Sequence, residues 1–193
     1  IIRNAVIYDG SGKASFTGDL GINADTIAHV GDLSKAIATN DIDAKGMALA
    51  PGFIDTHSHH DWGMFDIRDM PSCVSQGITT IVVGQDGGSN FPLSDFYKKV
   101  EKATVAVNVA SYTGHTTLRD SVIVGDYKRF CTPEEIEKMK SMLKQDMEAG
   151  SLGLSTGLEY DPGIFSHPDE VIDLAKVAAT SNGRYISHIR SED

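Results

Sequence analysis

The stretch "LAPGFIDTHSHHDWG" (residues 49–63) decides how the rest of the chain is interpreted. Apolar residues lead into Asp55, and three histidines and a further acid follow at once. Side chains two positions apart on a β-strand share a face, so Asp55, His57 and His59 would point the same way. Neutral imidazoles gathered at the end of a strand can hold a Zn²⁺-type cation. The sequence therefore predicts a metal site where this strand ends.

From residue 49 onward, strand-like and helix-like segments alternate. We predict strands in "APGFIDTH", "ITTIVVGQD", "TVAVNVASYTG", "SLGLSTGLEY" and "RYISHIRS" and helices in "MPSCVSQG", "PLSDFYKKVEKA", "TPEEIEKMKSMLKQDMEAG" and "PDEVIDLAKVAATSNG". The third helix has the clearest signals, because Thr132 and Glu135 form a capping-box pattern around Pro133. Apolar strands that alternate with helices predict an α/β fold with a parallel sheet covered by helices.

Length favours one form of this sheet. A (β/α)₈ TIM-type barrel takes ~250 residues, so residues 49–193 suffice for about the first four and a half units. An open doubly wound sheet is the alternative, but the chain has no GxGxxG or GxxxxGK[ST] loop to support a nucleotide site of that kind. We therefore expect a partial barrel in residues 49–193, from a chain that continues further.

Residues 1–48 differ in character, because short strand patterns follow one another without a helical period. "DLGINADTIAHVGD" predicts a hairpin with "NAD" at its bend, and "IDAKGMALAPGF" predicts a further pair of strands. We expect a small N-terminal β-sandwich module in residues 1–48, too thin to bury much core by itself.

Composition excludes some classes of partner. The formal net charge is −10, from 27 acidic and 17 basic residues, which argues against nucleic acid or an anionic membrane. No apolar run approaches the ~20 residues of a membrane span. Cys73 and Cys131 lie far apart without a CxxC spacing, and we expect reduced thiols in the cytoplasm. The chain opens at Ile1, and a lost signal peptide would instead indicate the periplasm.

Two other strand ends fit the same metal site. Asp86 stands where the second strand leaves the sheet, and His188 stands near the end of the fifth. Because barrel sites form at the carboxyl ends of strands, these side chains could converge with the first two histidines. The alternatives are a turn residue for Asp86 and a hydrogen-bonded core histidine for His188. His29 and His167, which lie outside such patterns, are expected to be structural.

These stretches resemble a known family. "PGFIDTHSHHD", "GITTIVVGQDGGS", "NVASYTGHTTLR", "GLSTGLEYDPG" and "YISHIRSED" are similar to the amidohydrolase superfamily, and more narrowly to its N-acyl-D-amino-acid deacylase (D-aminoacylase) branch. The resemblance implies that His57, His59 and His188 are metal ligands. The family commonly has a cysteine in "GNCG", where this chain has Asp86 in "GQDG". A carboxylate can ligate Zn²⁺ and bridge two ions, but it is harder than a thiolate.

The resemblance also implies an activity. It predicts a hydrolase with one or two Zn²⁺ ions that cleaves a small-molecule N-acyl-D-amino acid to a carboxylate and a free D-amino acid. In the family, a general-base aspartate and a further histidine ligand come from strands beyond residue 193, so catalysis would need the remainder of the chain to close the barrel. Strand four has no lysine, which disfavours dihydroorotase or hydantoinase activity. The alternatives are another amidohydrolase (D-dipeptidase, cyclic amidase or deaminase) and a non-catalytic metal-binding fragment.

Three further residues are candidates for substrate binding. Arg190 shares a face with His188 and could pair with a substrate carboxylate, or it could form a salt bridge with Glu192 or Asp193. Tyr160 follows strand four and could donate a hydrogen bond to the substrate or pack within its own loop. His115 follows strand three, in a loop that could form a pocket wall or begin a turn.

Overall fold

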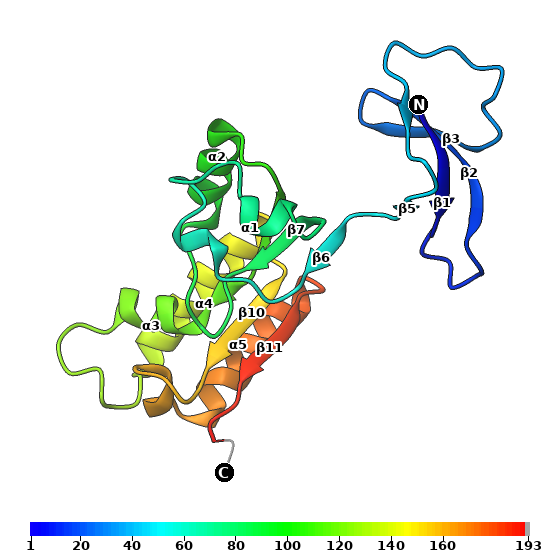
Figure 1. Cartoon of the computed structure of the whole chain (residues 1–193). Coiled ribbons are helices and arrows are strands. Elements are labelled where there is room, and N and C mark those ends of the chain that lie inside the picture. Colours follow the sequence, from blue (N-terminus) through cyan, green and yellow to red (C-terminus); the bar gives the residue numbers. More distant parts are fainter. Residues whose placement is uncertain (192–193) are drawn as a thin grey trace. The chain divides into compact units, whose positions relative to one another are not determined.

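The computed structural model describes residues 1–191 and consists of two compact units, Ile1–Gly52 and Phe53–Asp193 (Figure 1). The division falls close to the boundary that the sequence predicts after residue 48. Among the described residues, no helix combines the length and the apolar character needed to cross a membrane.

The N-terminal unit is built on one mixed sheet among its described residues. Its strands are β1 (Ile2–Ile7), β2 (Phe16–Asn23), β3 (Thr26–Gly31), β4 (Ile42–Asp43) and β5 (Ala48–Leu49). The order is β3-β2-β1-β4, and β5 also pairs with β1. The predicted hairpin joins β2 to β3, with Ala24 at its bend in the left-handed region (φ 54°). The predicted second strand pair is wrong, because β4 and β5 each pair with β1 in parallel.

The second unit contains the predicted parallel strands. They are β6 (Phe53–Asp55), β7 (Ile78–Val83), β8 (Asn108–Ser111), β9 (Thr113–Gly114), β10 (Gly153–Gly157) and β11 (Arg184–His188). Pairing is parallel throughout, in the orders β6-β7-β8 and β9-β10-β11. Only Tyr112 separates β8 from β9, so the two are one interrupted strand. A doubly wound sheet reverses its strand order, whereas these strands stay in chain order, as in a barrel wall. The described strands form an open part of such a wall.

The helices lie between these strands. They are α1 (Pro71–Val74), α2 (Leu93–Ala103), α3 (His115–Val122), α4 (Pro133–Glu148) and α5 (Pro168–Thr180), with short 3₁₀ helices η1 (His60–Trp62) and η2 (Gly163–Phe165). The predicted capping box begins α4: the Glu135 backbone N–H donates to Thr132 Oγ1 at 3.2 Å, and the Thr132 N–H donates to Glu135 Oε2 at 2.8 Å. Helix α3 stands where the sequence predicts a loop.

Two apolar clusters support the wall. The first joins the strand β7 to α1, α2 and the segment before α1, and the second joins α3, α4, α5 and β10 (Figure 1). Their fully buried members include Cys73, Ile81 and Leu93 in the first and Leu118, Leu143, Leu154 and Leu174 in the second. The clusters hold the strand ends in fixed register, and the candidate site lies at those ends.

Candidate metal centre

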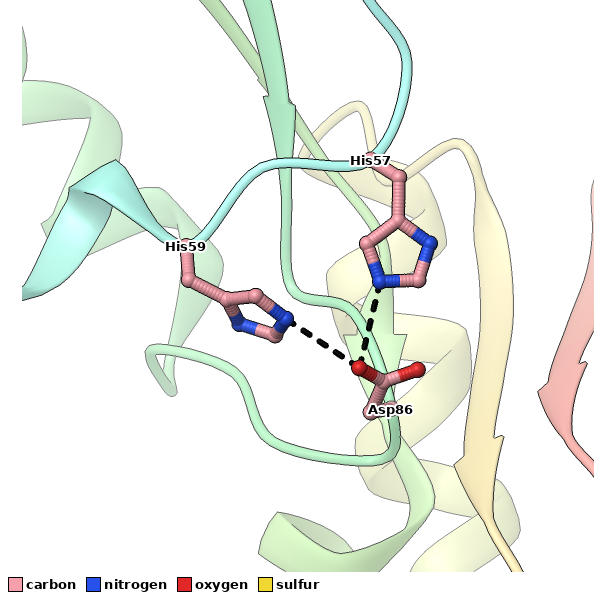
Figure 2. Close-up of side chains that lie close together, drawn as sticks. All are labelled: His57, His59 and Asp86. Carbon is pink, nitrogen blue, oxygen red and sulfur yellow. Dashed lines mark hydrogen bonds and ion pairs between the residues drawn. The ribbon is translucent and has the colours of Figure 1, made fainter.

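Three of the four predicted metal ligands meet. His57 Nε2 and His59 Nε2 each lie 3.1 Å from the same oxygen, Asp86 Oδ2 (Figure 2). One possible ligand atom from each of the three side chains lies within 4.8 Å of the others. The two imidazole side chains are about half exposed, and the Asp86 side chain is 22% exposed, so the cluster is open to solvent. A two-nitrogen, one-oxygen donor set of this kind can bind a divalent ion.

The histidines are placed by a segment that follows the first barrel strand. The strand β6 ends at Asp55. The Asp55 carboxylate accepts a hydrogen bond from the His57 backbone N–H at 3.2 Å. The chain nevertheless continues alongside β7, because the Ser58 N–H donates to the Val82 carbonyl at 2.9 Å. Ser58 is buried, whereas His57 and His59 on either side of it are exposed. The predicted alternation therefore holds beyond the strand, although Asp55 turns to the backbone and does not join the cluster.

Asp86 is placed by its neighbour in sequence. The Gln85 side chain is 2% exposed, and its Nε2 donates to the carbonyls of Thr56 (3.0 Å) and Val82 (3.1 Å). This amide ties the end of β6 to the end of β7. Because Gln85 points inward, the next side chain points outward to the histidines. No pattern in the sequence indicates this role, since a glutamine two residues before a glycine pair is typical of a loop.

Strand β10 holds the same loop from its other side. Ser155 Oγ donates to the Gly84 carbonyl at 2.6 Å and accepts from the Gly87 N–H at 3.3 Å. At Gly157, a Cβ atom would lie 2.1 Å from the Asp86 carbonyl oxygen, so the close approach of the two backbones requires glycine there. The ends of the second and fourth strands are therefore in direct contact at the cluster.

His188, the fourth predicted ligand, makes a separate pair. Its Nε2 lies 2.8 Å from Glu159 Oε2, and its ring stacks on Tyr160 with centroids 4.6 Å apart. Tyr160 also lines a pocket of about 440 Å³, together with His59, Trp62, Gln85, Asp86 and Gly88. The structure thus places Tyr160 in the pocket of the metal cluster and His188 against Tyr160.

The other two candidate substrate residues lie elsewhere. Arg190 donates to the carbonyls of Ile164 (2.7 Å) and Ser166 (3.3 Å), in and beside η2. Its predicted alternative partners, residues 192 and 193, lie outside the described residues. His115 is fully buried in the first turn of α3, so the structure does not bring it to the pocket of the cluster.

The buried partner of His115 is a feature that the sequence did not reveal. Glu170 Oε1 lies 2.7 Å from His115 Nε2, and both Glu170 oxygens lie 2.7 Å from Arg119 Nη1. Burial alone would raise the pKa of Glu170, but the hydrogen bonds from His115 and Arg119 outweigh it and lower the pKa below its ordinary value. The triad joins α3 to α5, and α3 in turn contacts the Asp86 loop, because the Thr117 N–H donates to the Gly87 carbonyl at 3.2 Å.

Asp61, which lies near the cluster, and His167, which lies at the start of α5, have structural partners. Asp61 is 8% exposed and accepts from Asn90 Nδ2 at 2.9 Å; burial raises the pKa of its carboxyl, and the nearby His59 and Asn90 oppose the rise. His167, expected to be structural, caps α5, because its Nδ1 accepts from the Asp169 backbone N–H at 3.2 Å.

Consecutive parallel strands with a two-histidine, one-carboxylate cluster at their carboxyl ends define a barrel-type protein with a candidate metal centre. The chain belongs to the amidohydrolase family, whose model matches residues 41–180.

Within that family, the chain is similar to deacylases of D-amino-acid derivatives. It is 34% identical to a D-aminoacylase and 36% identical to an N-acyl-D-aspartate deacylase, both of Alcaligenes xylosoxydans xylosoxydans. These alignments take in 100% of the chain but 44% and 43% of the two relatives. The crystal structure of N-acyl-D-glutamate deacylase from Bordetella bronchiseptica, in complex with zinc and a phosphonate mimic of the tetrahedral intermediate, superposes with a TM-score of 0.95 at 34% identity. That match covers 99% of this chain and 45% of the solved one, so the chain spans less than half the length of these relatives.

Proposed function

We propose that the whole protein is a zinc-dependent hydrolase that cleaves the amide bond of N-acyl-D-amino acids and releases a carboxylate and a free D-amino acid. The observation that carries the proposal is the meeting of His57, His59 and Asp86 at the strand ends. The similarity to deacylases along the whole chain supports the substrate class.

The residues present fit the proposed metal. Imidazole nitrogen and carboxylate oxygen are ordinary Zn²⁺ ligands, and three protein ligands leave a position open for water or substrate, as in catalytic zinc sites. His57, His59 and Asp86 would hold the ion. A bound Zn²⁺ supplies an acidified water and polarises the scissile carbonyl.

The chain's own residues would prepare the site for that chemistry. Gln85, through its two backbone contacts, keeps the Asp86 carboxylate facing the imidazoles, so no reorganisation is needed when the site is loaded. Tyr160 lines the same pocket, and its hydroxyl, which lies 3.4 Å from His188 Nδ1, could donate a hydrogen bond to the substrate. The base that transfers the proton to the leaving amine would come from a later strand of the whole barrel.

The proposed function also implies that the whole protein closes the barrel. The strands β6 and β11 form the two edges of the described wall, and Phe53 and Tyr185 on them are 63% and 46% exposed. Further strands from the whole protein would cover these edges, close a (β/α)₈ barrel and complete a sandwich with the N-terminal sheet.

The free thiols Cys73 and Cys131 support a reducing, cytoplasmic location.

The test is His57→Ala in the full-length protein, with His29→Ala as a matched control on an exposed position of β3. Zinc is counted by elemental analysis, and release of D-amino acid is measured on N-acetyl-D-amino acids. We expect His57→Ala to lose both bound zinc and activity and His29→Ala to retain both. A His57→Ala protein with full zinc content and an unaltered rate would refute the site.

A further inference from the structure

Two hydroxyl side chains dock the loop that carries Asp86 on the first turn of α3. The Ser89 backbone N–H donates to Thr117 Oγ1 at 2.9 Å, and the same threonine hydroxyl donates to the Ser89 carbonyl at 3.1 Å. The Ser89 hydroxyl accepts from the Gly114 backbone N–H at 2.8 Å. The two hydroxyls thus satisfy backbone groups of the loop and of the junction between β9 and α3.

The backbones of the loop and of α3 also touch. The Thr117 N–H donates to the carbonyl of Gly87, the residue directly after Asp86, at 3.2 Å. A Cβ atom at Gly114 would lie 2.2 Å from the Gly87 carbonyl oxygen, so no larger residue fits between the two segments. The hydroxyl contacts therefore hold a close approach that begins one residue from the carboxylate of the cluster.

Helix α3 is a fixed support for this loop. The buried carboxylate of Glu170 on α5 contacts His115 and Arg119, which lie on either side of Thr117 in the sequence. The first turn of α3 is therefore tied to a second helix, and it has little freedom to follow a moving loop.

Asp86 depends on such support. Its φ of 53° lies in the left-handed region, which a residue other than glycine adopts uncommonly and at a cost in energy. Its Oδ2 lies 3.1 Å from an imidazole nitrogen of both histidines of the cluster. Metal ligands have to stay within about 0.5 Å of their working positions, so a loop released from α3 would weaken the site.

We propose that Ser89 and Thr117 are positioning residues of the metal centre, which act on the ion through the Asp86 loop. Both lie outside the set of described residues that line the pocket of the cluster, so their effect on the ion is indirect. The proposal rests on the proposed function, because it requires a metal ion held by the cluster. Its consequence is that these two hydroxyls determine metal affinity as well as stability.

The experiment separates metal affinity from stability. Full-length protein is stripped with a chelator, and Zn²⁺ affinity is measured by calorimetric titration. The geometry of the ligands is followed by the visible absorption of the Co²⁺-loaded site, and stability is followed by urea unfolding of the metal-free protein.

Three variants test the two hydroxyls. Thr117→Val removes the hydroxyl at nearly constant volume, Thr117→Ser keeps it, and Ser89→Ala removes the acceptor for the Gly114 N–H. The matched control is Thr132→Val, which removes a threonine hydroxyl that also accepts from a backbone N–H, at the start of α4.

We expect Thr117→Val and Ser89→Ala to bind Zn²⁺ about 10-fold more weakly than the wild type and to change the Co²⁺ spectrum. Thr117→Ser should restore both the affinity and the spectrum. Thr132→Val should lower the urea midpoint and leave Zn²⁺ affinity unaltered, because a loss of stability elsewhere does not move the Asp86 carboxylate.

Wild-type Zn²⁺ affinity in Thr117→Val and Ser89→Ala would overturn the proposal. Thr117→Ser that binds as weakly as Thr117→Val would also overturn it, because the hydroxyl would then not be the group that acts. If Thr117→Val does not fold, Ser89→Ala decides alone, since it removes a single hydrogen bond.

Failure of the proposed function has a different signature. Zn²⁺ binding that follows these expectations, without release of D-amino acid from N-acetyl-D-amino acids, would refute the function and leave the positioning role in place. A wild type that binds no Zn²⁺ would refute both.

Discussion

Replacing Glu170 with glutamine should destabilise the protein strongly, because Glu170 is the centre of a buried charge network. His115, Arg119 and Glu170 are 0%, 0% and 1% exposed. Arg119 Nη1 contacts both carboxylate oxygens at 2.7 Å, and a glutamine would replace one acceptor with a donor and remove the charge. The Arg119 guanidinium would then be buried without a counter-charge. Removing one partner of a buried ion pair costs about 3–5 kcal/mol of unfolding free energy.

The pH dependence of this loss has a defined sign. The pKa of Glu170 is lowered in the folded protein, so the unfolded chain binds the proton more readily than the native one. The stabilisation from the carboxylate is then fully present above the ordinary pKa of 4.5 and is lost as the pH falls through the lower folded value. The difference in unfolding free energy between wild type and Glu170→Gln should stay constant from neutral pH down to about 5.5. It should become smaller as the pH falls below the ordinary pKa of a glutamate.

Urea unfolding followed by circular dichroism, repeated across this pH range, measures the loss of unfolding free energy and its dependence on pH. The matched control is Glu137→Gln, which removes an exposed glutamate that pairs with Lys140 on α4, and it should change stability by about 0–1 kcal/mol. If Glu170→Gln unfolds at the wild-type urea concentration, or if the difference does not narrow in acid, the argument for a stabilising buried triad fails.

Three further predictions follow from single contacts. Gly157→Ala should push the Asp86 loop away, because the new Cβ would lie 2.1 Å from the Asp86 carbonyl oxygen. The zinc affinity, measured by titration, should then fall about 10-fold. The control Gly63→Ala has open space around the new Cβ and should bind zinc with wild-type affinity. Thr132→Ala should lower the free energy of unfolding by about 1 kcal/mol in urea denaturation, because it removes the cap of α4, and an unchanged midpoint would contradict that role. Burial raises the pKa of Cys131 to about 12, so the native thiol should react with iodoacetamide at pH 8 far more slowly than in urea; equal rates would argue against the burial.

Local signals explain which helices the sequence could predict. The start of α4 is specified by Thr132 and Glu135, three residues apart, and both of the predicted capping contacts form. Helix α3 has no side-chain cap, and its β-branched residues are weak helix formers. It is held by contacts between distant residues, above all the ion pairs from His115 and Arg119 to Glu170. A pattern within one segment cannot reveal an interaction that spans 55 positions.

The sequence could likewise predict only part of the candidate site. The meeting of His57 and His59 with Asp86 could be predicted, because parallel strands in chain order bring their carboxyl ends together. The clamp made by Gln85 and the contact between Glu159 and His188 could not, because each depends on the direction of a side chain in a loop. Loop conformation is set by neighbouring strands, and the residues themselves have no periodic pattern to indicate it.

The close approach of neighbouring backbone segments, more than the spacing of the ligands along the sequence, determines where this metal cluster lies. A Cβ at Gly84 would lie 2.2 Å from the Tyr112 carbonyl oxygen, and one at Gly157 would lie 2.1 Å from that of Asp86. These glycines let the ends of three neighbouring strands touch, and Asp86 is the residue at the point of contact, held in the left-handed region (φ 53°). The backbone of Asp86 is held by these contacts, and its carboxylate faces the two imidazoles. A carboxylate on a fixed backbone binds an ion at a smaller cost in conformational entropy than one on a mobile loop.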